Sequence, residues 1–245
     1  MKRKVTYRSV TFWVESASAF EEEFWEYYSA NKWEPGNLDF MLDHVRRGIF
    51  LDIGAWIGPV SLLMSSFYEK VIAVDFDPVS NRTLQNNIAL NNITNIEQHA
   101  IGVADKEMDI EIDAANLGKS TTNLFSKTSA EKIRVRTMQF RTFIRTIQDA
   151  EKISIIKIDC EGAEYLFLKE VYQFIRGRKI IVHISYHPWV LKKPNYYLAK
   201  LFHWARQLQF RRYYFTGTGD LLVREPYAPL FFLKDRFPLA DFIES

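Results

Sequence analysis

The stretch GIFLDIGAWIGPVS, residues 48–61, combines a short apolar run with two glycines four residues apart. The run at 49–53 predicts a buried strand, and Pro59 suits the first turn of a following helix, where its missing N–H costs no hydrogen bond. Gly54 and Gly58 predict a tight turn that lets a ligand approach the backbone closely. The turn lacks both the three glycines of a dinucleotide-binding fold and the lysine of a phosphate-binding loop.

A second apolar run, VIAVDFDP at residues 71–78, predicts a strand that ends in an acid. Asp75 follows Gly54 by 21 residues, close to the spacing of roughly 20 at which an acid binds a ribose in nucleotide-binding βαβ units. Its two carboxylate oxygens can accept from two neighbouring hydroxyls, whereas Asp77 is predicted to cap the next helix. A ribose site beside a loop with no pyrophosphate pattern indicates S-adenosylmethionine and disfavours a dehydrogenase.

The bulk composition is that of an ordinary globular protein, with 47% hydrophobic and 25% charged residues in 245. A net charge of +2 gives no field that demands nucleic acid or an anionic membrane as a partner. We find neither a signal-peptide pattern nor the roughly 18 apolar residues of a membrane span, so we expect a cytoplasmic protein. A single cysteine, Cys160, excludes an internal disulfide and agrees with a reducing compartment.

The chain has no repeat or linker that would divide it, so a single domain over 1–245 is predicted. It comprises an N-terminal extension and helical lid (1–47, helical over 17–46), a core (48–225) and a C-terminal tail (226–245). From residue 49 onward, strands alternate with helices, which predicts an α/β fold with a doubly wound, seven-stranded sheet. The expected strands are 49–53, 70–75, 95–100, 153–158, 179–185, 210–215 and 220–224, with a hairpin-like excursion between the third and fourth and an antiparallel edge pair at the end.

Two acids, Asp159 and Glu161, follow the fourth strand in KIDCEGAE, at the sheet edge where open α/β sheets bind ligands. Asp159 is suited to contact a cofactor amino group, to orient an acceptor or to ligate a metal. The alternative is that Asp159 and Glu164 cap the next helix. For Glu161, function and structure are equally open, and Cys160 is predicted to be a small buried hydrophobe.

The segment IIVHISYHPW, residues 180–189, brings two histidines to the end of the fifth strand. His183 lies within the apolar run and is predicted to be a core residue. His187 precedes a proline, which favours an extended conformation at the rim of the site. There its imidazole can act as the base for methyl transfer to a hydroxyl, or make only a structural contact. The spacing of these side chains has no recognised metal-binding signature, so no metal is predicted.

Taken in order, FLDIGAWIG, the acid at Asp75, HAIGVADKEMDIEI and IIKIDCEGAE resemble the FkbM family of class I S-adenosylmethionine-dependent methyltransferases over roughly residues 33–190. The resemblance implies a Rossmann-like fold, S-adenosylmethionine as cofactor and O-methylation, with a sugar of a glycan or glycosylated metabolite as acceptor. Trp56 stands where the family usually has Asn, and Asp75 where it often has Glu. The ending VHISYHPW also departs from the family pattern.

Carried over position by position, the resemblance implies three sets of site residues. Phe76 is equally open as an adenine contact or a core residue, and Trp56 either shapes the methyl-donor pocket or narrows the entrance for the acceptor. The implied cofactor contacts are Asp52, Gly54, Ala55, Trp56, Gly58, Asp75, Phe76, Ala100, Ile101 and Asp159, the catalytic residues are His187 and Asp159, and the acceptor contacts are Glu161, Tyr186 and Trp189.

An alternative class is a methyltransferase-like module that binds RNA or DNA through basic and aromatic residues near its end. Arg211, Arg212, Tyr213 and Tyr214, with Arg145, could form such a surface, or could be alternating positions of an edge strand. Because the chain has no basic excess, no nucleic-acid partner is expected. The apolar tail is expected to pack on the domain, over the pocket or on a second subunit, so a homodimer is one expected arrangement.

Overall fold

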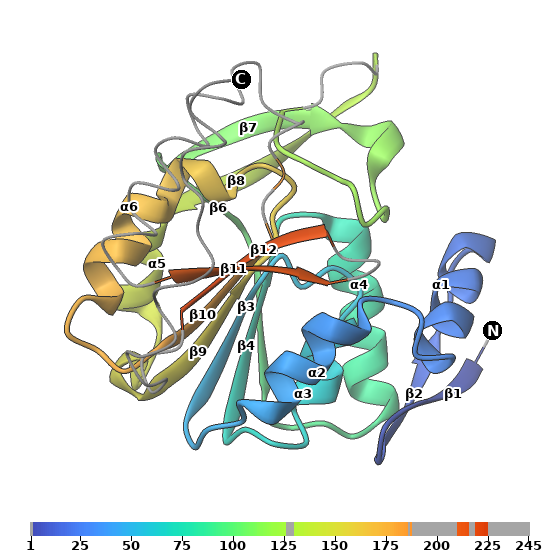
Figure 1. The fold of residues 1–245 in the computed structure, drawn as a ribbon. Coiled ribbons are helices and arrows are strands. Elements are labelled where there is room, and N and C mark those ends of the chain that lie inside the picture. Colours follow the sequence, from blue (N-terminus) through green and yellow to red (C-terminus); the bar gives the residue numbers. More distant parts are fainter. Residues whose placement is uncertain (1, 126–129, 186, 188–209, 216–218, 225–245) are drawn as a thin grey trace, which may run out of the picture.

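A computed structural model of the chain describes residues 2–125, 130–185, 187, 210–215 and 219–224. Its centre is a twisted sheet with helices on both faces (Figure 1). Over the described residues this sheet has seven strands in the order β11-β12-β10-β9-β3-β4-β5. The strands are β3 (Ile49–Ile53), β4 (Lys70–Asp75), β5 (Ile96–Ala100), β9 (Ile153–Ile158), β10 (Ile181–Ser185), β11 (Phe210–Phe215) and β12 (Gly219–Arg224).

The middle of the sheet is parallel, as the alternation of strands and helices predicts. β3 pairs in parallel with β4 on one side and β9 on the other, and β10 continues in parallel from β9. Only β12 runs antiparallel to the other strands of this sheet: it pairs antiparallel with β10 on one side and with β11, the edge strand, on the other. The order reverses between β3 and β9, and open α/β sheets bind ligands at the carboxyl ends of strands beside such a reversal.

Helices cover the two faces of the sheet and divide the core into two apolar clusters. Alternate residues of each strand face opposite clusters: Phe50 packs with one and Leu51 with the other. The first face carries α1 (Ala19–Ser29), α2 (Pro35–Asp43), α3 (Pro59–Met64) and α4 (Pro78–Leu90), and the second carries α5 (Phe140–Thr146) and α6 (Glu164–Ile175).

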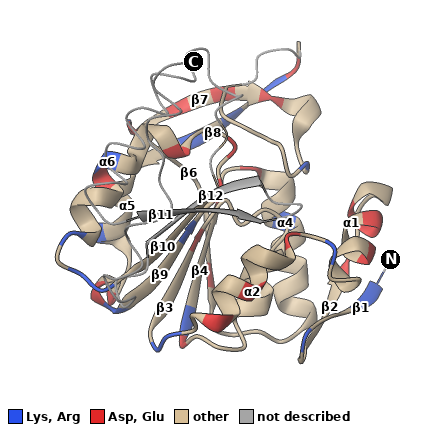
Figure 2. Ribbon diagram, viewed as in Figure 1, with Lys and Arg blue, Asp and Glu red and all other residues tan. Residues whose placement is uncertain are grey.

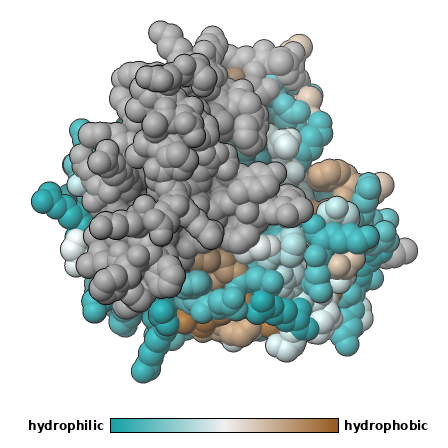
Figure 3. All heavy atoms as spheres, viewed as in Figure 1, coloured by the Kyte–Doolittle hydropathy of each residue, from teal (hydrophilic) through white to brown (hydrophobic). Residues whose placement is uncertain are grey.

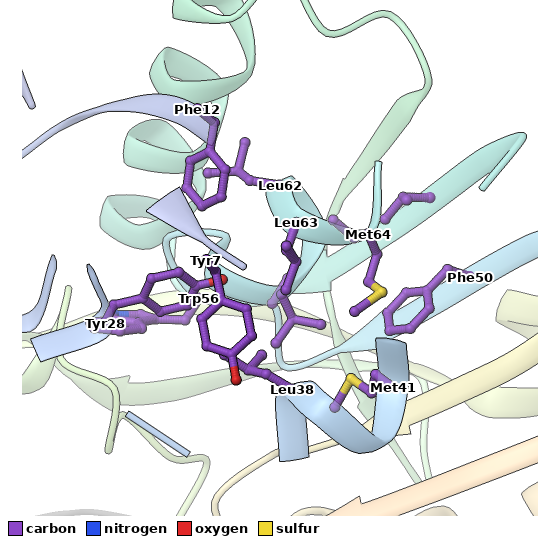
Figure 4. Close-up of a cluster of buried hydrophobic side chains, with 14 of the residues drawn as sticks. Tyr7, Phe12, Tyr28, Leu38, Met41, Phe50, Trp56, Leu62, Leu63 and Met64 are labelled. Atoms are coloured by element: carbon purple, nitrogen blue, oxygen red, sulfur yellow. The ribbon is translucent and has the colours of Figure 1, made fainter. Parts of the chain in front are cut away.

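The N-terminal extension is not purely helical, because its first fifteen residues contain an antiparallel hairpin. This hairpin consists of β1 (Lys2–Tyr7) and β2 (Val10–Glu15). Its buried positions alternate with exposed ones, a period-2 pattern that is visible in KVTYRSVTFWVE and that the helical prediction overlooked. The buried side chains are Val5, Tyr7, Phe12 and Val14, and Figure 4 shows Tyr7 and Phe12 together with Tyr28 in the first apolar cluster.

Side-chain amides on α4 hold the hairpin against the core. Asn87 Oδ1 accepts from the backbone N–H of Glu15 at 2.8 Å, and Asn91 Oδ1 accepts from that of Trp13 at 2.7 Å. Asn87 is fully buried, so its amide replaces the water that the open edge of β2 would otherwise need. The hairpin is therefore an integral part of the first face.

A second, smaller sheet forms the predicted excursion between β5 and β9. It contains β6 (Gly102–Ala104), β7 (Met108–Asp113) and β8 (Lys132–Gln139) in the order β6-β8-β7. β7 and β8 pair antiparallel, as a hairpin requires. Short 3-10 helices follow β7 at Ala114–Asn116 and precede β9 at Ala150–Lys152. The chain from 117 to 124 descends from this sheet toward the central one (Figure 1).

The described surface mixes both signs of charge. Figure 2 shows blue and red segments interspersed over the ribbon, with acidic residues gathered on α1. Hydrophilic and hydrophobic residues are interspersed on the described surface in Figure 3. Trp13, Phe20 and Tyr27 are about half exposed. Among the described helices, none has both the length and the apolar character needed to cross a bilayer.

Two adjacent aromatic residues test the packing of the hairpin. Phe12 is 4% exposed and Trp13 is 47% exposed. Replacing Phe12 by Ala should lower the free energy of unfolding by about 3–5 kcal/mol, because it leaves a cavity in the first cluster. Replacing Trp13 by Ala is the matched control and should cost about 1 kcal/mol or less. Urea unfolding measures both, and equal losses would show that the hairpin does not contribute to the core.

Candidate functional site

A pocket lies where β3, β4 and β9 end, at the edge of the sheet that the strand order favours. About 500 Å³ of space, part of it open to solvent, lies between its walls. Its walls come from the glycine loop after β3, the end of β4, residues 101–103, the loop 119–124 and the turn after β9. Seven predicted site residues line it: Gly54, Trp56, Asp75, Phe76, Ile101, Asp159 and Glu161.

Asp75 is fixed at the end of β4 by two backbone N–H groups. Its Oδ2 accepts from Trp56 N at 2.8 Å and its Oδ1 from Asp77 N at 2.9 Å. Burial raises the pKa of Asp75 to about 6, against the lowering effect of these two hydrogen bonds. Since a carboxylate has about four acceptor positions, each oxygen can still accept a second hydrogen bond from a ligand. The rigid acid is thus suited to a pair of neighbouring hydroxyls.

Beside the charged Asp75, the wall of the pocket is apolar. Phe76, Ile101, Val103 and Leu124 supply this wall. They come from two separate segments of the sheet edge and from the loop above it. An apolar wall next to an acid suits a ligand that combines a flat heterocycle with a ribose.

A buried lysine connects the glycine loop with the turn after β9. Lys157 Nζ lies 3.2 Å from Asp52 Oδ1 and 3.7 Å from Asp159 Oδ2, and it donates to the carbonyl oxygen of Gly54 at 2.8 Å. Burial alone would lower the pKa of Lys157, but the adjacent Asp52 and Asp159 raise it above its ordinary value. The ammonium therefore stays charged and fixes all three partners.

Asp52 does not line the pocket, and its predicted contact with the cofactor stays a prediction. Its side chain is fully buried, and its carboxylate is held by Lys157 and by the Ser61 hydroxyl, which donates to Oδ2 at 2.6 Å. Burial raises the pKa of Asp52, and Lys157 opposes that effect. The residue supports the glycine loop from below.

Three other predicted cofactor contacts also lie outside the pocket wall. Ala55 is buried behind the loop, and Ala100 ends β5 with its side chain exposed. Gly58 begins α3 at φ 95°, and a Cβ there would meet Leu84 Cδ1 at 2.4 Å. Gly58 is therefore needed for the packing of α3 against α4. Gly54, by contrast, does line the pocket, and its positive φ of 83° lets the loop approach the Asp159 carbonyl.

His187 lies within reach of three carboxylates beside the pocket. Its Nδ1–H donates to Glu164 Oε1 at 3.2 Å, and its backbone N–H donates to the same oxygen at 2.8 Å. Its Nε2 lies 3.5 Å from Asp159 Oδ1 and 3.6 Å from Glu161 Oε1. Glu164 is fully buried and also accepts from Gly162 N, so it serves both the predicted helix start and the position of His187.

The pKa values of His187 and Glu161 are both raised in this cluster. Burial would lower the pKa of His187, but the hydrogen bond to Glu164 and the charges of Asp159 and Glu161 raise it to about 9. Burial, opposed by His187, raises the pKa of Glu161 to about 7. At neutral pH, His187 is therefore mainly an imidazolium, whereas Glu161 lies near its pKa. The predicted role of His187 as a base depends on a neutral imidazole and is disfavoured at this pH.

A further acid that the sequence did not indicate belongs to the same cluster. Glu34 begins α2 in a left-handed conformation, with φ 42°. Burial and the charge of Asp159 raise its pKa to about 7. Asn37 Nδ2 donates to Glu34 Oε2 at 2.8 Å, and His183 Nε2 donates to Asn37 Oδ1 at 3.0 Å. His183 is fully buried, as predicted, and its pKa is lowered to about 4 by burial.

Three side chains of the cluster could also hold a metal ion. One ligand atom each from Asp159, Glu161 and His187 lies within 4.8 Å of the others, and no second group of this kind occurs in the part of the chain that the structure describes. The sequence analysis considered a metal held by Asp159, Glu161 and a histidine, and predicted none because their spacing has no recognised signature. With His187 protonated, the imidazolium itself supplies the positive charge between the carboxylates.

Other predicted site residues have different outcomes. Tyr186 and Trp189 lie outside the described residues. Cys160 was predicted to be a small buried hydrophobe; it is partly buried, packs against the second apolar cluster and also lines the pocket. Asp77 caps α4 as predicted, and its Oδ2 in addition accepts from Gly118 N at 2.6 Å. Of the residues that the sequence reasoning missed, Lys157 gave a signal, since a lysine within an apolar strand needs a partner.

The buried pair of Lys157 and Asp52 gives a test of the site's foundation. Replacing Lys157 by Met should lower the free energy of unfolding by about 3–5 kcal/mol, because it leaves a buried carboxylate without a counter-charge. Adding Asp52→Asn to this variant removes that charge and should recover most of the loss. Urea unfolding of both variants measures the difference. If Lys157→Met alone were as stable as the double variant, Lys157 would not be the counter-charge of Asp52.

The sequence of the chain matches a family model described as the methyltransferase FkbM domain over residues 52–214, about two thirds of its length. The matched region contains the pocket-lining residues from Ile53 to Ala163. Among curated proteins, none matches the chain.

Solved structures share the fold at low sequence identity. The chain is similar to a methyltransferase FkbM from Methylobacillus flagellatus KT, with TM-score 0.52 and 19% identity over 75% of this chain and 46% of that one. The chain thus spans less than half the length of that protein. Other similar structures are an rRNA methylase from Streptococcus thermophilus (TM-score 0.45, 11% identity, 77% and 92% covered) and M. jannaschii TYW2 in complex with AdoMet (TM-score 0.42, 13% identity, 91% and 84% covered).

The pocket fits the cofactor of this family. Asp75 retains free acceptor positions for a diol, the adjacent wall is apolar, and carboxylates near Gly54 suit a cationic ligand. S-adenosylmethionine is the cofactor, and no pyrophosphate-binding pattern competes with it. By its sequence match and its fold, the chain belongs to the FkbM family of class I S-adenosylmethionine-dependent methyltransferases.

Proposed function

We propose that the protein transfers a methyl group from S-adenosylmethionine to a hydroxyl, on a sugar of a glycan or glycosylated metabolite. The observation that carries this proposal is the cluster of His187, Asp159 and Glu161 beside the cofactor pocket. A hydroxyl acceptor must be held by hydrogen-bond acceptors and must lose its proton. The cluster offers groups for both tasks.

In this proposal, each part of the pocket takes one part of the cofactor. Asp75 accepts from the two ribose hydroxyls, and Phe76 and Ile101 contact the adenine. Gly54 and Asp159 face the methionine part, whose ammonium suits a carboxylate. The cofactor supplies a methyl group on a positively charged sulfur, and the protein positions an oxygen in line with it.

The balance of charge supports a ligand that is cationic or rich in hydroxyl donors. Two positive side chains, Lys157 and His187, lie among five carboxylates: Asp52, Asp159, Glu161, Glu164 and Glu34. Both oxygens of Glu164 accept from backbone N–H groups, and Asp52 is held by the Ser61 hydroxyl and by its ion pair with Lys157. Asp159, Glu161 and Glu34 remain to accept from the several hydroxyls of a sugar.

We propose that Glu161 receives the proton of the acceptor at neutral pH. Its pKa of about 7 lies near the working pH, where a general base combines the right protonation state with sufficient basicity. Asp159 orients the hydroxyl, and the imidazolium of His187 holds both carboxylates in place. This assignment keeps His187 and Asp159 in the catalytic centre and moves the role of base from His187 to Glu161.

The alternative of a nucleic-acid-binding module gains no support from the described residues. β11 contains the basic and aromatic residues 211–214. It is an edge strand of the sheet, as the alternative to a nucleic-acid surface predicts. Arg145 lies in the last turn of α5, at a hollow lined by both acidic and basic side chains. We therefore do not propose nucleic acid as the acceptor.

Mass spectrometry of glycan fractions tests the proposed acceptor. Incubation of the protein with S-adenosylmethionine carrying a trideuterated methyl group should add one labelled methyl ether to a sugar. Asp75→Ala should abolish the transfer by loss of cofactor binding, and Glu161→Gln should reduce it while S-adenosylhomocysteine still binds. Asp149→Asn, at an exposed acid far from the pocket, is the matched control. Label found only on nitrogen, or on RNA, would overturn the proposal.

The pH dependence of single-turnover methyl transfer tests the base. If Glu161 is the base, the rate rises with pH through about 7, because the deprotonated carboxylate is the active form. Glu161→Gln should lower the rate by about 10²–10⁴-fold and remove this limb. A limb near pH 9 that persists in Glu161→Gln and disappears in His187→Gln would identify His187 as the base instead.

A further inference from the structure

The roof of the cofactor pocket is a loop, residues 117–124, in the connection between strands β7 and β8 of the small sheet. Lys119, Ser120, Thr122 and Leu124 belong to it and line the pocket. The loop keeps its own shape through local hydrogen bonds: Lys119 N and the Thr122 hydroxyl both donate to the carbonyl oxygen of Asn116. A compact loop of this kind can move as a unit relative to the pocket beneath it.

One residue of this loop is bonded to both strand ends that form the pocket floor. The carbonyl oxygen of Gly118 accepts from Trp56 Nε1 at 2.9 Å, and its N–H donates to Asp77 Oδ2 at 2.6 Å. Gly118 has a positive φ of 80°, and a Cβ there would lie 3.1 Å from Val79 Cγ1. The close approach of loop and floor at this point thus requires glycine.

The donor in the glycine loop, Trp56, is itself held on three sides. Its backbone N–H donates to Asp75 Oδ2, and its indole meets the ring of Phe24 edge-on at 4.5 Å between centroids. Its φ of 49° places a bulky residue in the left-handed region, which costs about 1 kcal/mol or more. The same residue therefore joins the ribose-binding acid, helix α1 and the roof loop.

We propose that Trp56 is a positioning residue that latches the loop 117–124 over the bound cofactor through Gly118, and that the loop opens there for cofactor exchange. This inference rests on the assignment of the pocket to S-adenosylmethionine, and it concerns Trp56 alone among the pocket residues. It explains why a ring with an N–H group occupies a backbone position that suits Asn. The long indole side chain reaches the carbonyl oxygen of Gly118 in the loop, whereas the shorter side chain of Asn would not extend that far.

Trp56→Phe is the test variant, because it keeps an aromatic ring against Phe24 and removes the N–H donor. Stopped-flow displacement of S-adenosylhomocysteine should show a dissociation rate about 3- to 10-fold faster than in the wild type, the effect of losing one hydrogen bond. Hydrogen–deuterium exchange of residues 117–124 should become faster in the same variant. Gly118→Ala disturbs the latch from the other side and should also speed dissociation.

Phe24→Leu is the matched control, since it alters the packing of the indole and leaves its N–H free to bond. Its dissociation rate should stay within about twofold of the wild type. Equal rates in wild type, Trp56→Phe and Gly118→Ala would overturn the latch, as would unchanged exchange in the loop. Should Trp56→Phe fail to fold, the rate in Gly118→Ala decides. Absence of binding to the wild type would instead refute the cofactor assignment itself.

Discussion

The site depends on one buried ammonium. Lys157 is an interior residue of β9, yet its Nζ reaches the Asp52 carboxylate, the Gly54 carbonyl and Asp159. A buried carboxylate and a buried ammonium are tolerated only as a pair, because neither could be desolvated alone. That requirement fixes β3 against β9 in register and sets the distance between the glycine loop and the turn after β9. The cofactor pocket is the space that remains between these two segments.

Much of the fold was predictable because it depends on local patterns. Apolar runs locate the central strands, and the spacing from Gly54 to Asp75 locates the ribose acid. The hairpin at the N-terminus was also visible as alternation, and was missed because aromatic spacing further on favoured helices. The meeting of Glu34 with Asp159 and His187 could not be predicted, since it joins three elements that are distant in sequence. The burial of Asp52 beneath the loop depends likewise on a partner about a hundred residues away.

Three residues around the pocket have a strained backbone. Glu34, Trp56 and Glu161 all have positive φ although none is glycine. Such residues persist only where surrounding contacts hold them, and each is held here by the interactions that define the site. Asn37 fixes Glu34, Phe24 and Gly118 fix Trp56, and His187 faces Glu161. The carboxylates and the indole thus point in directions that a relaxed chain would not select.

The position of β9 in the sheet also has a consequence for how the chain reaches its fold. β3, β4 and β5 are consecutive and can pair as soon as they are synthesised, but the other edge of β3 must wait for residues 153–158. During that interval an apolar strand edge is open to solvent and to other chains. Closure requires a long-range parallel pairing, which is slow. The residues between β5 and β9, including the small sheet and the roof loop, are therefore synthesised before the cofactor pocket can form.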